Sequence, residues 1–161
     1  MKFNLSEEQI LVRDAAREFA QTELLPGVIE RDELQKFPDN LVKKMAELGF
    51  MGIMVDPKYG GSGMDTLSYA LVMEELSKVD ASASVIVSVN NSLVCFGLEA
   101  YGTEKQKQKY LTKLAAGEWI GAFCLSEPEA GSDATSQSTT AVDKGDPVSY
   151  THLTLPTKLA V

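Results

Sequence analysis

Residues 123–134, which read FCLSEPEAGSDA, carry the residue types most suited to holding a polar ligand. A short apolar run enters a turn that is dense in hydroxyls and small residues. Backbone N–H and C=O groups just past a strand end are free of the ladder, so they can address the edge of a heterocycle. Ser126 adds a hydroxyl donor, and Gly131 permits a close approach. The alternative is a plain strand–turn–strand connection, because Glu-Pro and Gly-Ser-Asp are common turn sequences.

Other reactive residue types favour ordinary structural roles. The run GGSG at residues 60–63 is not followed by Lys-Ser or Lys-Thr, which favours a mobile surface loop over a phosphate loop. Cys95 and Cys124 have no second Cys or His at ligand spacing, so we expect two buried free thiols and no metal site. The only histidine, His152, supports neither a triad nor a metal site.

Composition limits the classes of protein to which the chain can belong. The 161 residues are enough to bury a core, and 44% hydrophobic with 24% charged residues is typical of soluble globular proteins. No apolar run approaches the roughly 20 residues needed to span a membrane, and no secretion signal is evident, so we expect a cytoplasmic protein. The net charge of -8 argues against a nucleic-acid partner, which needs clustered Lys and Arg.

Several helices are predicted to precede and position residues 123–134. One begins at Ser6, whose spacing to Gln9 is a capping box, carries Leu11 on its apolar stripe and ends at Pro26. A second starts near Pro38 and stops at Gly49.

Further helices follow a glycine-rich loop. One runs from about Asp65 to Lys78, and Asp80 is placed to cap the next. Residues 81–100 are almost uncharged and predict a central helix buried on several sides, although their β-branched runs are also compatible with strand. Thr103 opens the last helix, and residues 119–125 then suit a buried strand.

Residues 125–133, which read LSEPEAGSD, resemble the first signature of the acyl-CoA dehydrogenase family, in which a small residue, Ser or Thr, Glu and Pro precede Gly-Ser-Asp. Three further blocks resemble the same family: LGFMGI with YGGSG (residues 48–53 and 59–63), NSL (91–93) and YGTEKQK (101–107). Their order and spacing match over roughly residues 1–146, which is more specific than any single motif.

The resemblance implies an enzyme that oxidises the Cα–Cβ bond of an acyl-CoA thioester, passing a hydride to FAD and electrons to an electron-transferring flavoprotein. It places Phe123, Cys124, Leu125 and Ser126 against the isoalloxazine ring and Ser132 against the CoA portion of the substrate. The cofactor then performs the hydride transfer, while the protein supplies orientation and hydrogen bonds.

The resemblance assigns no catalytic residue to this chain. In the family a glutamate much later in the chain removes the α-proton, so Glu127 is expected to be structural. The resemblance is closest to short-chain, butyryl-type members and implies a homotetramer for the full-length enzyme. An acyl-CoA oxidase or related flavoprotein fits the same residues. A non-enzymatic helical interaction module is the alternative of another class, which the turn at residues 126–133 disfavours.

We therefore expect a mainly α fold in three parts. Residues 1–117 form an acyl-CoA dehydrogenase-like helical bundle, residues 118–146 hold the first strands of an incomplete β domain, and residues 147–161 are a non-native tail. The tail reads PVSYTHLTLPTKLAV and resembles translated sequencing adapter joined to a truncated reading frame. The rest of the β domain, the C-terminal helical bundle, the catalytic glutamate and the adenine-binding residues are then expected to be missing.

Overall fold

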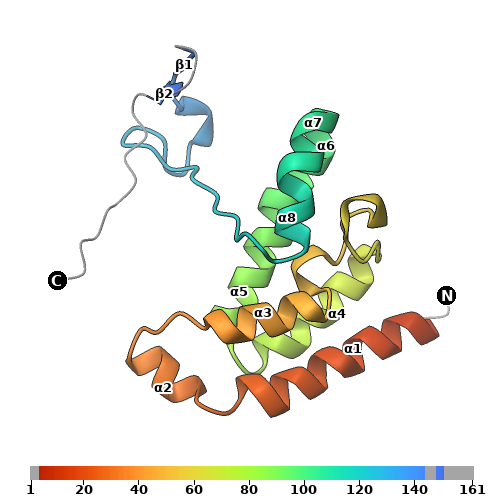
Figure 1. The fold of residues 1–161 in the computed structure, drawn as a ribbon. Coiled ribbons are helices and arrows are strands. Elements are labelled where there is room, and N and C mark those ends of the chain that lie inside the picture. Colours follow the sequence, from red (N-terminus) through yellow and green to blue (C-terminus); the bar gives the residue numbers. More distant parts are fainter. Residues whose placement is uncertain (1–3, 144–147, 151–161) are drawn as a thin grey trace. The chain divides into compact units, whose positions relative to one another are not determined.

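The computed structural model describes residues 4–143 and 148–150. The chain divides into two compact units, Met1–Ala122 and Phe123–Val161. The described part of the first unit contains helices and loops, whereas the second contains turns and two short strands (Figure 1). The expected mainly α character is therefore confirmed.

Helix α1 (Glu7–Phe19) begins where the sequence predicts it. The Ser6 hydroxyl accepts a hydrogen bond from the Gln9 amide, and the Gln9 side chain accepts one from the Ser6 amide, which is the predicted capping box. The helix continues through a π-helical stretch, Ala20–Leu24.

The buried stripe of α1 consists of Val12, Ala16 and Phe19, at i, i+4 and i+7. The expectation that Leu11 belongs to this stripe is wrong, because its side chain is 72% exposed. Successive helix residues point about 100° apart, so a stripe centred on Val12, Ala16 and Phe19 turns Leu11 away from the core.

A short helix that the sequence pattern did not predict, α2 (Val28–Glu33), follows. None of its residues is buried. Its position depends on Arg31, whose guanidinium donates hydrogen bonds to the carbonyls of Leu24 and Pro26 and forms an ion pair with Asp80 at 2.9 Å. A helix held by polar contacts leaves no hydrophobic period in the sequence, so pattern analysis missed it.

Helix α3 (Asp39–Glu47) stops at Gly49, as predicted. Gly49 has a φ of 76°, a left-handed conformation that glycine adopts without strain. The chain then forms two 3₁₀ turns, Phe50–Gly52 and Pro57–Tyr59.

The glycine-rich loop that follows is tied to the preceding turn. The amides of Ser62 and Gly63 donate hydrogen bonds of 2.8 and 2.9 Å to the carbonyls of Gly52 and Val55. A Cβ on Gly61 would lie 2.1 Å from the Val55 carbonyl oxygen, so only glycine is accommodated there. Because these amides already have partners, they cannot cradle a phosphate, and the phosphate-loop alternative is excluded.

Helices α4 (Thr66–Ser77) and α5 (Ala81–Ser88) both begin at predicted caps. The carboxylates of Asp65 and Asp80 each accept a hydrogen bond from the amide three residues further on, at 2.7 and 2.9 Å. These bonds satisfy amides that have no partner within the helix.

A partly buried ion pair joins α1 to α4, which pack against each other. The Arg17 guanidinium donates to both carboxylate oxygens of Glu75 at 2.9 and 3.0 Å, and the Lys78 ammonium donates to one of them at 2.9 Å. Hydrogen bonding to Arg17 and then to Lys78 lowers the pKa of Glu75 to about 2, although burial opposes this. Glu75 is therefore ionised at neutral pH and links the two helices.

Helix α5 continues through a π-helical stretch, Val89–Cys95, into α6 (Phe96–Tyr101). This continuous helix is long and apolar enough to cross a membrane by length and composition alone, so the expectation that no segment reaches that length is wrong. The buried side chains of Asn90 and Asn91 hydrogen-bond to backbone groups outside the helix, which is how a core helix of a globular domain behaves.

The last helix of the unit opens with the predicted capping box at α7 (Glu104–Gln106). It runs through a π-helical stretch, Lys107–Leu111, into α8 (Thr112–Ala115). Gly117, with a φ of 67°, follows its end.

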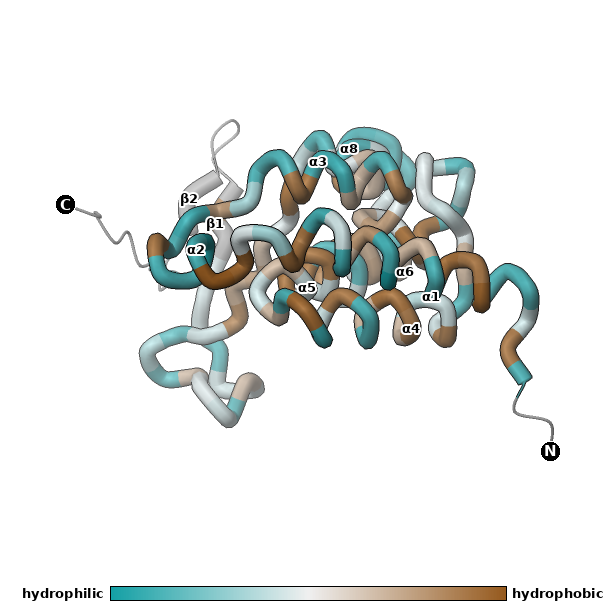
Figure 2. Tube along the Cα trace, turned by 90° about the horizontal axis from the view of Figure 1, so that it is seen from below, coloured by the Kyte–Doolittle hydropathy of each residue, from teal (hydrophilic) through white to brown (hydrophobic). Residues whose placement is uncertain are grey.

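Apolar and polar positions alternate along these helices, as the brown and teal segments of Figure 2 show. The buried apolar side chains form two clusters. The larger one includes the rings of Phe19 and Phe50, which meet edge to face with centroids 6.3 Å apart. The smaller one joins Tyr59 and Cys95 to the last helix. The helical unit therefore has its own core.

The second unit contains two short antiparallel strands, β1 (Ala141–Asp143) and β2 (Val148–Tyr150). Residues 119–125 form no strand, so that expectation is wrong. A strand needs backbone hydrogen bonds from a neighbour, and no described segment supplies them to these residues. The β domain expected from residue 118 onward stays a prediction.

Three residues of the segment expected to be a non-native tail form β2, in which Tyr150 lies opposite Ala141 and Val148 opposite Asp143. Residues 147 and 151–161, which include the only histidine, lie outside the described residues. The foreign origin of the tail therefore stays a prediction.

Candidate functional site

Four of the predicted ligand-contacting residues form one irregular stretch at the start of the second unit. Phe123 and Leu125 are 51% and 41% exposed, and Cys124 and Ser126 are exposed as well. Within the described structure no strand pairs with this stretch. Its backbone groups are therefore open to a ligand, apart from the Leu125 carbonyl, which accepts a hydrogen bond from the Gln137 side chain at 2.8 Å.

A tight turn follows, in which the amide and carbonyl of Glu127 pair with those of Ala130 at 3.1 Å in both directions. Ser132 lies in the exposed bend beyond it. Among the residues that the structure describes, the hydroxyls of Ser126 and Ser132 have no hydrogen-bond partner, so both are available to a ligand.

The Glu127 carboxylate closes the loop that carries these hydroxyls. It accepts hydrogen bonds from the amides of Ser138 and Thr139 at 2.7 and 3.2 Å. Thr139 and then Ser138 lower the pKa of Glu127, because hydrogen bonds favour the charged form. A carboxylate engaged in this way is a weak general base, which agrees with a structural role.

A second carboxylate, Asp133, caps the 3₁₀ turn Ala134–Ser136. It accepts hydrogen bonds from the Thr135 amide at 3.1 Å and from the Ser136 hydroxyl at 2.6 Å. Ser136 and then Thr135 lower the pKa of Asp133. The ionised carboxylates of Glu127 and Asp133 therefore stabilise this loop by hydrogen bonds within it.

The two cysteines differ in environment. Cys95 is buried, and burial, with the Glu99 charge as a smaller cause, raises the pKa of its thiol to about 12. Cys124 is exposed, so the expectation of a buried thiol is wrong for it, because no described segment covers the stretch in which it lies. The described residues contain no cluster of three or more His, Cys, Asp and Glu able to hold a metal ion.

The central helix contains a buried polar pair whose hydrogen bonds the sequence pattern did not predict. Asn90 and Asn91 are 0% and 2% exposed. The Asn90 side chain donates hydrogen bonds to the carbonyls of Met51 and Leu114 at 2.7 and 3.1 Å and accepts one from the Gly121 amide at 3.0 Å. Adjacent asparagines in an almost uncharged helix were the available signal, since a buried amide must find partners.

The Asn91 side chain also makes three hydrogen bonds to backbone groups, but its partners differ from those of Asn90. Its side chain donates to the carbonyls of Phe50 and Val87 at 2.8 and 2.9 Å and accepts from the Ile53 amide at 2.8 Å. Both asparagines lie in the π-helical stretch Val89–Cys95, and π-helical turns recur at functional sites.

One face of the central helix is apolar and exposed in the described structure. Val85, Leu93 and Phe96 are 56%, 43% and 57% exposed. Their spacing places them along one side of the helix. The expectation of burial on several sides is therefore wrong for this face of the helix.

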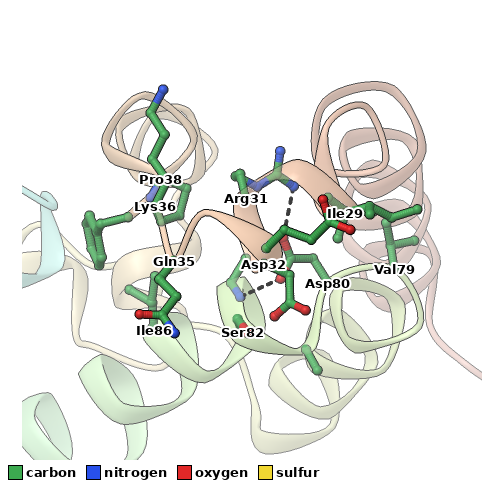
Figure 3. Close-up of a pocket in the computed structure, with 15 residues that line it drawn as sticks. Ile29, Arg31, Asp32, Gln35, Lys36, Pro38, Val79, Asp80, Ser82 and Ile86 are labelled. Carbon is green, nitrogen blue, oxygen red and sulfur yellow. Dashed lines mark hydrogen bonds and ion pairs between the residues drawn. The ribbon is translucent and has the colours of Figure 1, made fainter.

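A hollow of about 680 Å³ lies between α2 and the start of α5 (Figure 3). Ile29 and Ile86 line it, and the ion pair of Arg31 with Asp80 lies in its wall. None of the predicted site residues lines it, and the paired charges already hold α2, so the hollow offers no reactive group of its own.

The fold and the segment together define a helical domain joined to an irregular, hydroxyl-bearing stretch with open backbone groups. The family model described as "Acyl-CoA dehydrogenase, N-terminal domain" matches residues 6–118. The chain belongs to the acyl-CoA dehydrogenase family.

Individual relatives agree with this assignment. The chain is 51% identical over 146 residues to the short-chain-specific acyl-CoA dehydrogenase of Clostridium acetobutylicum, a match that covers 91% of this chain and 38% of that protein. It is 45% identical over 142 residues to subunit CarC of the caffeyl-CoA reductase–Etf complex of Acetobacterium woodii, with 88% of this chain and 38% of that protein covered.

A solved structure gives the same result. The crystal structure of a glutaryl-CoA dehydrogenase from Mycobacterium smegmatis in complex with FADH2 matches with a TM-score of 0.80 at 36% identity, over 85% of this chain and 35% of that chain. The chain thus spans at most 38% of the length of these three relatives.

Proposed function

We propose that this chain supplies the N-terminal helical domain and the first flavin-contacting segment of an FAD-dependent acyl-CoA dehydrogenase that acts on short acyl chains. The observation that carries the proposal is the joint occurrence of the matched helical domain with a signature segment, residues 125–133, whose two serine hydroxyls are free and exposed. The short-chain relative at 51% identity supports the acyl length.

In this proposal Phe123, Cys124, Leu125 and Ser126 lie against the isoalloxazine ring of FAD. Their open backbone groups and the Ser126 hydroxyl suit the polar edge of the ring, and the exposed apolar side chains suit its face. FAD, when bound, supplies the hydride acceptor, and these residues orient it. The FADH2 complex of the M. smegmatis relative supports this cofactor.

The substrate is proposed to contact two places in the chain. The free Ser132 hydroxyl binds the CoA portion, as the signature implies. The apolar stripe of Val85, Leu93 and Phe96 receives the acyl chain, because a hydrocarbon chain gains free energy by leaving water for apolar side chains.

No residue of this chain is proposed as the base that removes the α-proton, because Glu127 is committed to its loop. An electron-transferring flavoprotein is the proposed electron acceptor, which the name of the A. woodii relative supports. The homotetramer and the cytoplasmic location remain predictions for the full-length enzyme.

The test joins residues 1–146 to the downstream sequence of a short-chain relative and compares this protein with the present chain. We expect the joined protein to be yellow, with a flavin absorption band that butyryl-CoA bleaches. We expect the present chain to be colourless, because one segment encloses too little of the cofactor. A folded joined protein without flavin would overturn the function, and a yellow, butyryl-CoA-bleached present chain would overturn the view that the site is incomplete.

Point variants of the joined protein test the residue roles. Ser126→Ala should weaken FAD binding by roughly tenfold, because it deletes a hydroxyl aimed at the ring. Glu127→Gln is the control and should retain turnover. Complete loss of turnover in Glu127→Gln would contradict the assignment. Rapid peroxide formation from oxygen by the reduced flavin would identify an acyl-CoA oxidase instead.

A further inference from the structure

We infer that Asn90 is a positioning residue, whose buried side-chain amide holds the backbone at Gly121 and so sets the point from which the proposed flavin-contacting segment leaves the helical unit. The inference rests on the proposed function only for the identity of that segment. The geometry itself lies within the helical unit Met1–Ala122.

Three hydrogen bonds to backbone groups determine how the Asn90 side-chain amide is oriented, and its NH2 group also lies 3.7 Å from the Cys95 sulfur. The NH2 group donates to two carbonyls, of Met51 and Leu114, and the side-chain oxygen accepts from the Gly121 amide. The reversed orientation would set an oxygen against two oxygens and an NH2 group against an N–H. The Gly121 amide therefore donates to the side-chain oxygen of Asn90, the only acceptor in that side chain.

Packing at Gly121 points to the same contact independently of the hydrogen bond. A Cβ on Gly121 would lie 2.6 Å from a methyl carbon of Val94, one helical turn beyond Asn90. Two residues earlier, the Trp119 amide donates to the Lys113 carbonyl at 3.2 Å. The exit of the chain is thus held at two points: Trp119 is bonded to Lys113 in α8, and Gly121 is bonded to Asn90 and packed on Val94 in the central helix.

Because residues 123–126 follow Gly121 closely in the chain, a fixed Gly121 limits the positions that they can reach. Ser126 is five residues beyond Gly121, and an extended chain covers at most about 3.6 Å per residue, so the two lie within about 18 Å of each other. Release of Gly121 therefore lengthens the free part of the chain and broadens the positions open to Phe123 and Ser126.

Asn91 provides a matched control. It is equally buried and also makes three side-chain hydrogen bonds, but its partners are Phe50, Ile53 and Val87, and none lies in the exit segment. Replacing either asparagine by alanine removes three hydrogen bonds to backbone groups, and for Asn90 also a long contact to the Cys95 sulfur, so both variants should lose similar amounts of global stability.

The experiment measures amide hydrogen exchange and Trp119 fluorescence in the present chain without flavin. In the unaltered chain the Gly121 amide should exchange at least about tenfold more slowly than the amides of Ala122 and Phe123. Asn90→Ala should abolish this difference and shift the emission of Trp119, the only tryptophan, while Asn91→Ala should preserve both.

Asn90→Asp keeps an acceptor for the Gly121 amide but sets an oxygen against the Met51 and Leu114 carbonyls, so it should lower global stability while the Gly121 amide keeps more protection, relative to its neighbours, than in Asn90→Ala. This partial rescue separates positioning from general destabilisation. If the Asn90 variants do not fold, the protection of the Gly121 amide in the unaltered chain and in Asn91→Ala still decides the question. A Gly121 amide that exchanges as fast as its neighbours in the unaltered chain, or equal loss of its protection in Asn91→Ala, would overturn the inference. Since flavin is absent, a failure of the proposed function leaves these results unaffected.

Discussion

The helical unit and the loop that follows it are held together by different interactions. In the helical unit, side chains far apart in sequence, such as Phe19 and Phe50, meet in a buried cluster. In the loop, the side-chain bonds of Glu127 and Gln137 join residues about a dozen positions apart on an exposed surface.

This difference assigns a role to each region. Apolar burial stabilises a domain cooperatively, whereas exposed hydrogen bonds exchange with those of water and contribute little net stability. The helical unit therefore has the character of a scaffold, and the loop is the proposed ligand surface. Binding residues are often found on loops that a rigid scaffold presents.

The largest expected effect comes from breaking the scaffold. Phe50 is 2% exposed and packs edge to face on Phe19. Phe50→Ala should lower the free energy of unfolding by about 3–5 kcal/mol, because it removes a buried ring and leaves a cavity. Denaturant unfolding followed by circular dichroism measures this. The control Leu11→Ala should change it by less than about 0.5 kcal/mol, and equal effects would contradict the packing of α1.

An intermediate effect is expected at the ion pair between α1 and α4. Glu75→Gln should lower the free energy of unfolding by roughly 1–3 kcal/mol at neutral pH, because it leaves Arg17 without its charged partner.

The same variant has a defined pH dependence. The pKa of Glu75 is lowered from 4.5 to about 2, so its stabilisation is present in full above pH 4.5 and is lost as pH falls toward 2. Unfolding of the two proteins across this window should show their difference shrinking with acid. A difference independent of pH would show that the carboxylate charge is not what stabilises the pair.

The smallest global effect is expected in the loop. Glu127→Gln should leave the thermal melt of the helical unit unchanged, because the hydrogen bonds of Glu127 to described residues lie within the second unit. Hydrogen exchange at the amides of Ser138 and Thr139 should quicken severalfold, because these amides lose a charged acceptor. A lowered melting temperature would show that the loop stabilises the helices and would contradict the view that the two regions are stabilised independently.

Features that depend on local chemistry were readable from the sequence. The caps at Ser6, Asp65, Asp80 and Thr103 are as predicted, because a helix end needs an acceptor at a fixed offset whatever surrounds it. The signature at residues 125–133 was equally readable, because family membership is a property of residue order. The mainly α fold and the family follow from these features.

Tertiary structure alone decided which groups meet. It buried Val12 rather than Leu11, and it positioned α2 through the ion pair of Arg31 with Asp80. Among the described residues, it gave residues 119–125 no partner strand. Sequence periodicity states which side of an element is apolar, but it does not state what lies opposite that side. The partners of a buried amide or an unpaired strand come from segments distant in sequence, and only the folded chain brings these together.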